Sequence, residues 1–198
     1  LVGSAYQNVG NFKKAKENFK FGLKLDPKNI ALLNNLAMSH KNLLEYKLSE
    51  RIYLNIINQN KKYINAFINL GNLKRDLNKF EEAIDLYKKA LNIDDKNPVI
   101  YYSLALAYQG IGNFEKAINY SKKVLDISPK FSQASHLISQ SKKFTDRSDE
   151  DYLELKNKLI DITENSLAKV DVYFSLAKAE EDLGNIKEAT NYLIKGNK

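Results

Sequence analysis

The sequence predicts an all-α protein, a right-handed superhelical α-solenoid built from stacked helix-turn-helix units. Small and aromatic residues recur along the chain with a period of 34 residues. Only 3 Pro and 8 Gly occur among 198 residues, so few positions interrupt a helix. A single helical hairpin cannot bury its apolar face, and units of this period must therefore stack on their neighbours.

Several registers of the repeat keep the same phase over more than one hundred residues. Small residues return where small residues stood before, and aromatic residues return where aromatic residues stood. The registers are Ala15/Ser49/Ala83/Ala117, Phe12/Tyr46/Phe80/Phe114, Val2/Leu36/Leu70/Leu104, Gly3/Ala37/Gly71/Ala105 and Phe19/Tyr53/Tyr87. This agreement divides the first part of the chain into a partial repeat at 1–29 and full repeats at 30–63, 64–97 and 98–131.

Each unit contains two apolar stripes with helical spacing. In the unit that starts at Ile64, the first stripe ends at Leu77 and the second begins at Phe80. We expect Gly71 and Ala83 to let the two helices approach closely, with Phe80 filling the space beside them. Leu1 falls inside the first helix of its unit, so we expect the chain to be part of a longer protein.

The turn between the two helices uses residues that tolerate a left-handed backbone. Gly10, Asn78 and Gly112 occupy the same position of the repeat. Gly and Asn commonly end a helix in that conformation. Leu44 takes this position in the repeat at 30–63, and we expect its backbone to be strained.

The last third of the chain departs from the regular period. Ala189 lies two periods plus four residues after Ala117, which indicates an insertion between them. We interpret 132–169 as a divergent helical hairpin with a lengthened turn, and 170–198 as a final, truncated repeat. The insertion is either a plain surface loop or part of a binding side, and Ser148 or Asp149 is expected to cap its second helix.

The repeat resembles the tetratricopeptide repeat (TPR). The residues that carry the resemblance are the Asn-Leu-Gly-Asn run at 69–72, Phe80, the Glu-Ala-Ile run at 82–84, Tyr87 and the Lys-Ala-Leu run at 89–91. The resemblance covers 1–131 and 170–198, and it implies a protein-binding scaffold. The segments 173–179, 181–184 and 195–197 are similar to the last repeat of bacterial arrays that precede a sulfotransferase domain. That second resemblance implies a substrate-presenting region of a larger enzyme whose catalytic domain lies outside this chain.

Composition excludes several kinds of chemistry. The chain has no cysteine, so it has neither disulfides nor thiolate metal sites. His40 and His136 lack a neighbouring histidine at ligand spacing, so we expect no metal site, no cofactor and no catalysis by this chain. His40 is expected in the core. The net charge is +7, but the lysines are scattered among acidic residues, and we therefore expect no nucleic-acid partner.

In arrays of this kind the first helix of each unit lines a concave groove. The groove residues that we expect to contact a partner are Asn34, Asn35, Lys41, Asn65, Asn69, Asn72, Arg75, Tyr102, Gln109 and His136. An amide donates and accepts hydrogen bonds, so Asn can pair with the main chain of an extended peptide. The alternative is that these amides form an ordinary wet surface.

The expected partner is a protein or peptide. End-to-end self-association is a further possibility, because Leu193 and Ile194 would present apolar surface at the end of the array. The sequence shows no membrane span of about 18 apolar residues and no signal peptide. We therefore expect a cytoplasmic location and no membrane partner.

Overall fold

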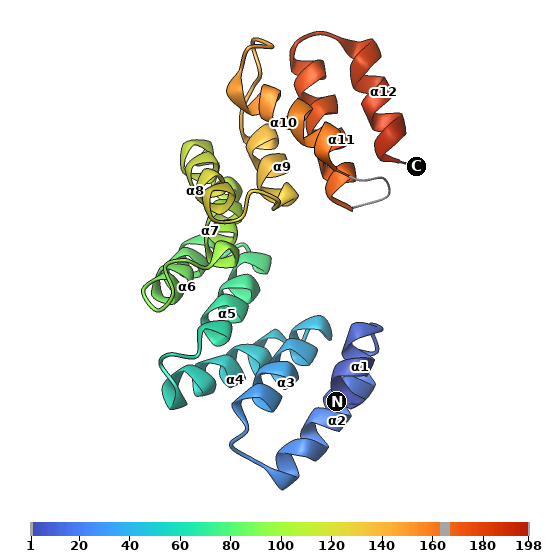
Figure 1. The fold of residues 1–198 in the computed structure, drawn as a ribbon. Helices are drawn as coiled ribbons and strands as arrows, with labels where there is room; N and C mark the ends of the chain where they lie inside the picture. Colours follow the sequence, from blue (N-terminus) through green and yellow to red (C-terminus); the bar gives the residue numbers. More distant parts are fainter. Residues whose placement is uncertain (1, 163–166, 198) are drawn as a thin grey trace. The chain divides into compact units, whose positions relative to one another are not determined.

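The computed structural model describes residues 2–162 and 167–197, and in those residues every regular element is an α-helix (Figure 1). The prediction of an all-α fold is therefore confirmed. The helices are α1 (Val2–Asn8), α2 (Phe12–Leu25), α3 (Ile30–Asn42), α4 (Tyr46–Gln59), α5 (Ile64–Asp76), α6 (Phe80–Leu91), α7 (Pro98–Gly110), α8 (Phe114–Ile127), α9 (Ser132–Ser141), α10 (Glu150–Asp161), α11 (Leu167–Asp182) and α12 (Ile186–Gly196). The chain forms two compact units, Leu1–Asp95 and Lys96–Lys198.

The first unit consists of three hairpins, α1/α2, α3/α4 and α5/α6, and helices α3 and α5 each pack on the hairpin before them. Leu36 of α3 packs in one cluster with Ala15 and Phe19 of α2. Leu70 of α5 packs in the next cluster with Tyr53 of α4. The same residue types thus make the same contact at successive repeats, which is the stacking that the 34-residue period predicts.

The small residues of the repeat face large side chains across the hairpin. A Cβ atom added to Gly71 would lie 2.4 Å from the Tyr87 ring, and one added to Gly3 would lie 2.6 Å from the Phe19 ring. The ring beside Gly71 therefore belongs to Tyr87, whereas we expected Phe80, which is only half-buried. The reason is geometric, because Tyr87 lies two turns further along α6, where its ring faces Gly71 of α5.

The turns between the paired helices adopt the left-handed backbone that the sequence predicts. The φ angles are 75° at Gly10, 57° at Asn78 and 75° at Gly112. Leu44 has φ 61° and is a branched, bulky residue in this region. An L-residue loses about 1–2 kcal/mol in the left-handed region.

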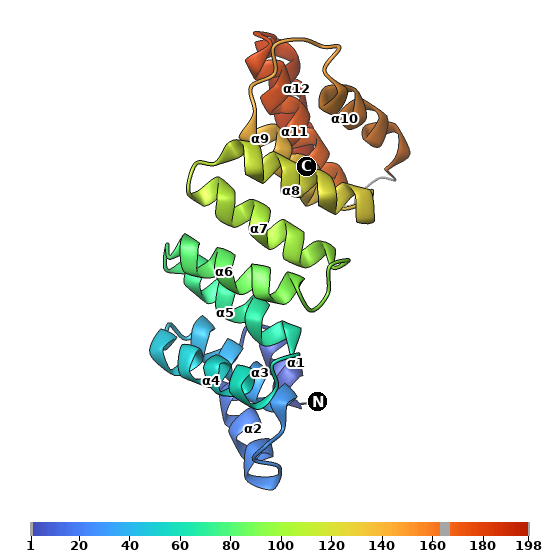
Figure 2. The same cartoon turned by 90° about the vertical axis from the view of Figure 1, so that its left-hand side faces the viewer.

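The second unit begins with a regular hairpin, α7/α8, and then changes its pattern. Helix α9 packs on α8 and on α11, whereas α10 packs mainly on α11 and only slightly on α9. Figure 2 shows α10 set to one side of α9 and α11. The segment 132–169 thus differs from the hairpin that we expected, because its two helices do not pack along each other. The pairing partner of α9 is α11.

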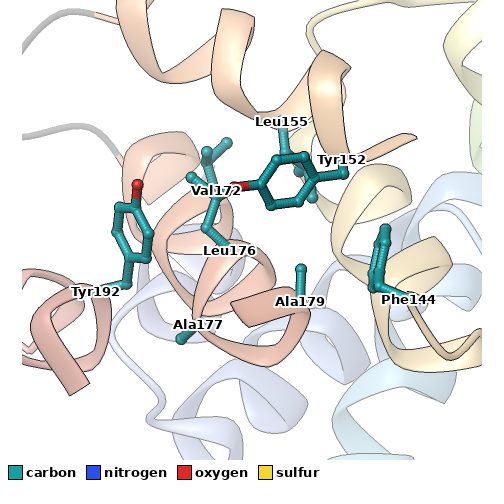
Figure 3. Close-up of a cluster of buried hydrophobic side chains, with 8 residues drawn as sticks. All are labelled: Phe144, Tyr152, Leu155, Val172, Leu176, Ala177, Ala179 and Tyr192. Carbon is teal, nitrogen blue, oxygen red and sulfur yellow. The ribbon is translucent and has the colours of Figure 1, made fainter. Parts of the chain in front are cut away.

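Side chains of the preceding loop, α11 and α12 bury the apolar face of α10. Tyr152 and Leu155 of α10 lie against Val172 and Leu176 of α11, and Phe144 from the loop before α10 closes the cluster (Figure 3). Ala177, Ala179 and Tyr192 complete this cluster of buried residues. Asp149 caps α10 by accepting from the backbone N–H of Asp151 at 3.0 Å, so it and not Ser148 is the cap.

A buried carboxylate joins the inserted segment to α11. Glu180 is buried and accepts hydrogen bonds from the Tyr152 hydroxyl at 2.6 Å, from Arg147 at 2.9 Å and from the Asn185 amide at 3.1 Å. Burial by itself would raise the pKa of Glu180, but these hydrogen bonds outweigh it and hold the pKa below its ordinary value of 4.5. The loop, α10 and α12 are therefore all tied to one ionised group.

Candidate functional site

The first helices α3 and α5 are joined side by side through polar side chains. The Asn69 amide of α5 donates to the Asn34 carbonyl oxygen of α3 at 2.9 Å. Asn34 is buried and Asn69 is half-buried. Asn34 therefore serves the contact between repeats, and Asn69 keeps part of its amide at the surface.

Asn72 is turned toward the inside of its own hairpin. Its carbonyl oxygen accepts a hydrogen bond from the Tyr87 hydroxyl of α6 at 2.7 Å. Tyr87 is fully buried, so this bond supplies a partner for a hydroxyl that water does not reach. A change at Asn72 would disturb the hairpin itself, which makes it a poor probe of partner binding.

Charged groups gather where α3 and α5 end. Lys41 forms an ion pair with Asp76 at 2.6 Å, and Arg75 lies 3.6 Å from the other oxygen of the same carboxylate. All three side chains are partly exposed. Two cations therefore share one anion, and this end of the face carries an excess of positive charge.

Two amides of this face point outward. Asn65 on α5 is exposed, and Asn35 on α3 is half-buried. Within the residues that the structure describes, neither side-chain amide is used to hold the fold together. They are the members of the expected set whose hydrogen-bonding groups are most available.

In the second unit the expected residues contact other parts of the fold. The Tyr102 ring lies 5.1 Å from the Phe131 ring, centroid to centroid. The Gln109 amide donates to the Ser141 hydroxyl at 3.3 Å and so bridges α7 to α9. Both side chains are half-buried. They contribute to packing between first helices as well as to the surface.

His136 lies in a polar row between α9 and α11. Its Nδ1 is 3.0 Å from the Ser175 hydroxyl, and its Nε2 is 2.9 Å from the Gln140 amide nitrogen. Ser175 donates its own proton to the Asp171 carbonyl, so Nδ1 is the donor and Nε2 accepts. Burial lowers the pKa of His136 below 6.5, and nearby Asp171 only partly offsets this. Each ring nitrogen of the neutral imidazole thus has a hydrogen-bond partner within the fold.

The other histidine lies in the first unit and is buried, as we expected. The His40 ring contacts the Glu45 carboxylate, which also accepts from Lys16 at 2.8 Å. Hydrogen bonds from Lys16 and then His40 lower the pKa of Glu45. In residues 2–162 and 167–197, no three acidic or histidine side chains lie close enough to form a metal site.

Sequence reasoning missed the partners of these residues. Asn69 lies 35 residues after Asn34, one more than the period, and it is the residue that Asn34 contacts. In the second unit, Asp171 lies 39 residues after Ser132 and accepts from its hydroxyl at 2.6 Å. The spacing of 39 residues exceeds the spacing of 35 between Asn34 and Asn69 by four, which is the number of extra residues in the insertion. The repeat register, shifted by those four residues, relates the second contact to the first.

Protein-family models match three stretches of the chain. A "TPR repeat" model matches residues 71–112, and a "Tetratricopeptide repeat" model matches residues 1–29. A model of the Fis1 C-terminal tetratricopeptide repeat matches residues 99–147. The chain carries tetratricopeptide repeats. No curated protein matches the sequence.

Solved structures share the fold of this TPR chain. PilW, described as a widely conserved type IV pilus biogenesis factor, matches with a TM-score of 0.76 and 18% identity over 98% of this chain and 88% of its own. The pilF protein of Pseudomonas aeruginosa matches with a TM-score of 0.76 and 15% identity, over 98% and 86%. MamA matches with a TM-score of 0.61 and 21% identity, over 100% and 97%. The predicted TPR solenoid is thereby confirmed.

The comparisons give no support to the sulfotransferase resemblance. None of the family models and structures named above is a sulfotransferase. The described helices also include none that is long and apolar enough to cross a membrane.

Proposed function

We propose that this TPR chain is a protein-interaction scaffold, and that the α3/α5 face of the first unit holds an extended peptide segment of its partner. The proposal is carried by the amides on neighbouring first helices that keep some exposure to solvent. Among the described residues, the amides of Asn35 and Asn65 make no contact that holds the fold together, and Asn69 is half-buried beside Asn34. Each amide offers both a donor and an acceptor, which matches the N–H and C=O groups of an extended main chain. Recognition of this kind depends little on the side chains of the peptide.

The charges at the end of this face favour one feature in the peptide. Lys41 and Arg75 share the single carboxylate of Asp76. An acidic side chain or a terminal carboxylate of the partner would supply the second anion, in a charge-assisted hydrogen bond with Arg75. We therefore propose a partner segment with an acidic residue near one end.

The first unit is the better candidate because its amides are less engaged in the fold. In the second unit, Gln109 bridges two helices and both nitrogens of His136 are occupied. Using them would break existing hydrogen bonds, and each bond contributes about 0.5–1.5 kcal/mol net. Asn65 and Asn35 carry no such penalty.

The test uses a displayed library of random 12-residue peptides, selected on the intact chain. The selected peptide is then synthesised, and its affinity is measured by fluorescence anisotropy against variants. The double change Asn35→Ala, Asn65→Ala should weaken binding about tenfold, as expected for two lost hydrogen bonds. The matched control is Asn55→Ala, Asn58→Ala, two exposed amides on the second helix α4.

The outcomes separate the proposal from its alternatives. Selected peptides should contain acidic residues, and the control variant should bind them like the unchanged chain. Equal loss of affinity in both variants would assign binding to a general effect of amide content. A library that yields no binding peptide would indicate that the amides are ordinary surface groups, and it would reject the proposal that the α3/α5 face binds a peptide.

A further inference from the structure

The outer face of α4 differs from the same face of the other regular second helices, α2, α6 and α8. Leu48 and Leu54 of α4 are 40% and 45% exposed. The sister repeats have exposed charged residues at these positions, Lys14, Glu82 and Lys116 for Leu48, and Lys20, Lys88 and Lys122 for Leu54. The hairpin α3/α4 packs between α1/α2 and α5/α6, so this face belongs to an internal repeat.

A third leucine lies in the turn before α4 and occupies its position at an energetic cost. Leu44 has φ 61°, a left-handed conformation that disfavours branched L-residues, where the sister repeats have Gly or Asn. Its side chain is 70% exposed, so packing within the described residues offsets little of this cost. Backbone strain that the fold does not require often marks a functional position. The side chain of Leu44 therefore points to a contact with another molecule.

Positive charge lies among these leucines. Lys47 and Arg51 are exposed, and neither forms an ion pair in the part of the chain that the structure describes. Arg51 lies three residues from Leu48 and three from Leu54, a spacing that makes side chains neighbours on a helix surface. The face thus consists of a cationic centre with a leucine on either side.

The carboxylates of this helix do not balance that charge, because cations of other helices engage them. Glu45, at the start of α4, pairs with Lys16 of α2 at 2.8 Å. Glu50 pairs with Lys74 of α5 at 2.7 Å. Both acidic groups therefore serve contacts between helices, and the outer face keeps its cations for an anion from outside.

We propose that the α4 face, formed by Leu44, Lys47, Leu48, Arg51 and Leu54, binds an amphipathic helix of a partner protein in which acidic residues accompany the apolar ones. Apolar side chains of that helix cover the leucines, and its carboxylates pair with the two cations. The leucines are spread around Arg51 and do not form the broad apolar face with which a helix enters a membrane surface. A protein helix therefore fits this face better than a lipid surface does.

This surface is separate from the amides proposed to hold an extended peptide. Those amides lie on the first helices α3 and α5, whereas the α4 face lies on a second helix. The two proposals therefore succeed or fail independently, and each has its own variants.

The test selects helical peptides from a displayed library on the intact 198-residue chain. Peptides that also bind the double variant Leu48→Lys, Leu54→Lys are removed. The repeats at 1–29 and 98–131 have lysine at both positions, so this variant should fold. The remaining peptides should combine apolar and acidic residues, and fluorescence anisotropy should show about tenfold weaker binding to the variant. If no selected peptide distinguishes the two chains, the proposal is wrong.

Two further variants test the charges and the strained leucine. Lys47→Glu, Arg51→Asp introduces the residues that α6 has at these positions, and should weaken the binding of acidic peptides about tenfold or more. Leu44→Asn should weaken binding severalfold although it relieves strain, so affinity and stability should change in opposite directions. Unchanged affinity in either variant would contradict the assignment of the face. The control is Leu153→Lys on α10, a 48% exposed leucine of the second unit, which should leave affinity unchanged.

Vesicles of phosphatidylcholine and phosphatidylserine test the lipid alternative. The chain should not sediment with these vesicles. Sedimentation that the Leu48→Lys, Leu54→Lys variant loses would assign the face to an anionic lipid surface and overturn the proposal of a partner helix. Circular dichroism verifies that every variant is folded.

Discussion

Replacing Leu44 by Asn should stabilise the first unit. Leu44 ends the turn between α3 and α4 with φ 61°, where sister repeats have Gly10, Asn78 and Gly112. An L-residue loses about 1–2 kcal/mol in the left-handed region, and Asn reduces this loss because its short polar side chain tolerates that conformation. Leu44 is 70% exposed. Removing its side chain therefore forfeits only about 0.6 kcal/mol of burial.

The net gain expected for Leu44→Asn is about 0.5–1 kcal/mol, the difference between relieved strain and lost burial. Urea unfolding followed by far-ultraviolet circular dichroism measures it, and the melting temperature should rise by about 2 °C for a chain of this length. The reverse change, Asn78→Leu, should destabilise the chain by a similar amount, because Asn78 has φ 57° and also lies in the left-handed region.

The control for Leu44→Asn is Leu25→Asn. Leu25 is 78% exposed and ends α2, but its φ is not positive. The change removes the same side chain without relieving any strain, so it should leave stability unchanged or slightly lower. If Leu44→Asn and Leu25→Asn behave alike, the explanation by backbone strain is wrong.

Three further predictions follow from buried polar groups. Met38→Asn should raise stability by about 1 kcal/mol, measured by urea unfolding, because the buried Tyr53 hydroxyl has no hydrogen-bond partner and Asn72 supplies one at the same position of the next repeat. Glu180→Gln should destabilise the chain at neutral pH and should reduce the stability that is lost below about pH 4.5. The folded state lowers the pKa of this carboxylate, so its stabilising contribution is present above the unfolded pKa and is lost as pH falls through the folded pKa. Urea unfolding at pH 7 and at about pH 4 measures both effects. The His136 ring should titrate below pH 6.5 in an NMR titration, and a value above 6.5 would contradict its burial as a neutral group.

The regular part of the fold was predictable because each repeat solves the same packing problem. Ala15, Ser49, Ala83 and Ala117 are all completely buried, since each lies where two helices cross. A side chain that must be small at one crossing must be small at the next. The period of such residues therefore predicts both the helices and their order of stacking.

The inserted segment was less predictable because its contacts do not follow the period. The stripe of Tyr152 and Leu155 correctly indicates a buried helix face. It does not say which neighbour buries that face. The hydrogen bonds by which Glu180 of α11 holds Arg147 and Tyr152 of the inserted segment are not contained in the periodic pattern.

The helices that carry the candidate residues were predictable from the register, but the contacts of their side chains were not. The register places Asn34, Asn69 and Asn72 on first helices. Which of them is available depends on the residue across the interface. Asn72 accepts a hydrogen bond from the buried Tyr87 hydroxyl of its own hairpin, whereas the buried Asn34 accepts one from Asn69 of the next repeat. Such pairings require the crossing of neighbouring helices, which a linear pattern does not contain.

Because α9 packs directly on α11, the stack of helices continues past α10. A repeat array usually transmits its geometry through every helix in turn, so an extra helix would shift all that follow. Here α10 lies to one side of α9 and α11, and its apolar face and the hydrogen bond of Tyr152 to Glu180 attach it to α11. Sequence change on the exposed face of that helix can alter the surface of the chain while the packing of α9 on α11 stays the same. The insertion is thus a place where a repeat protein can acquire new surface without rebuilding its framework.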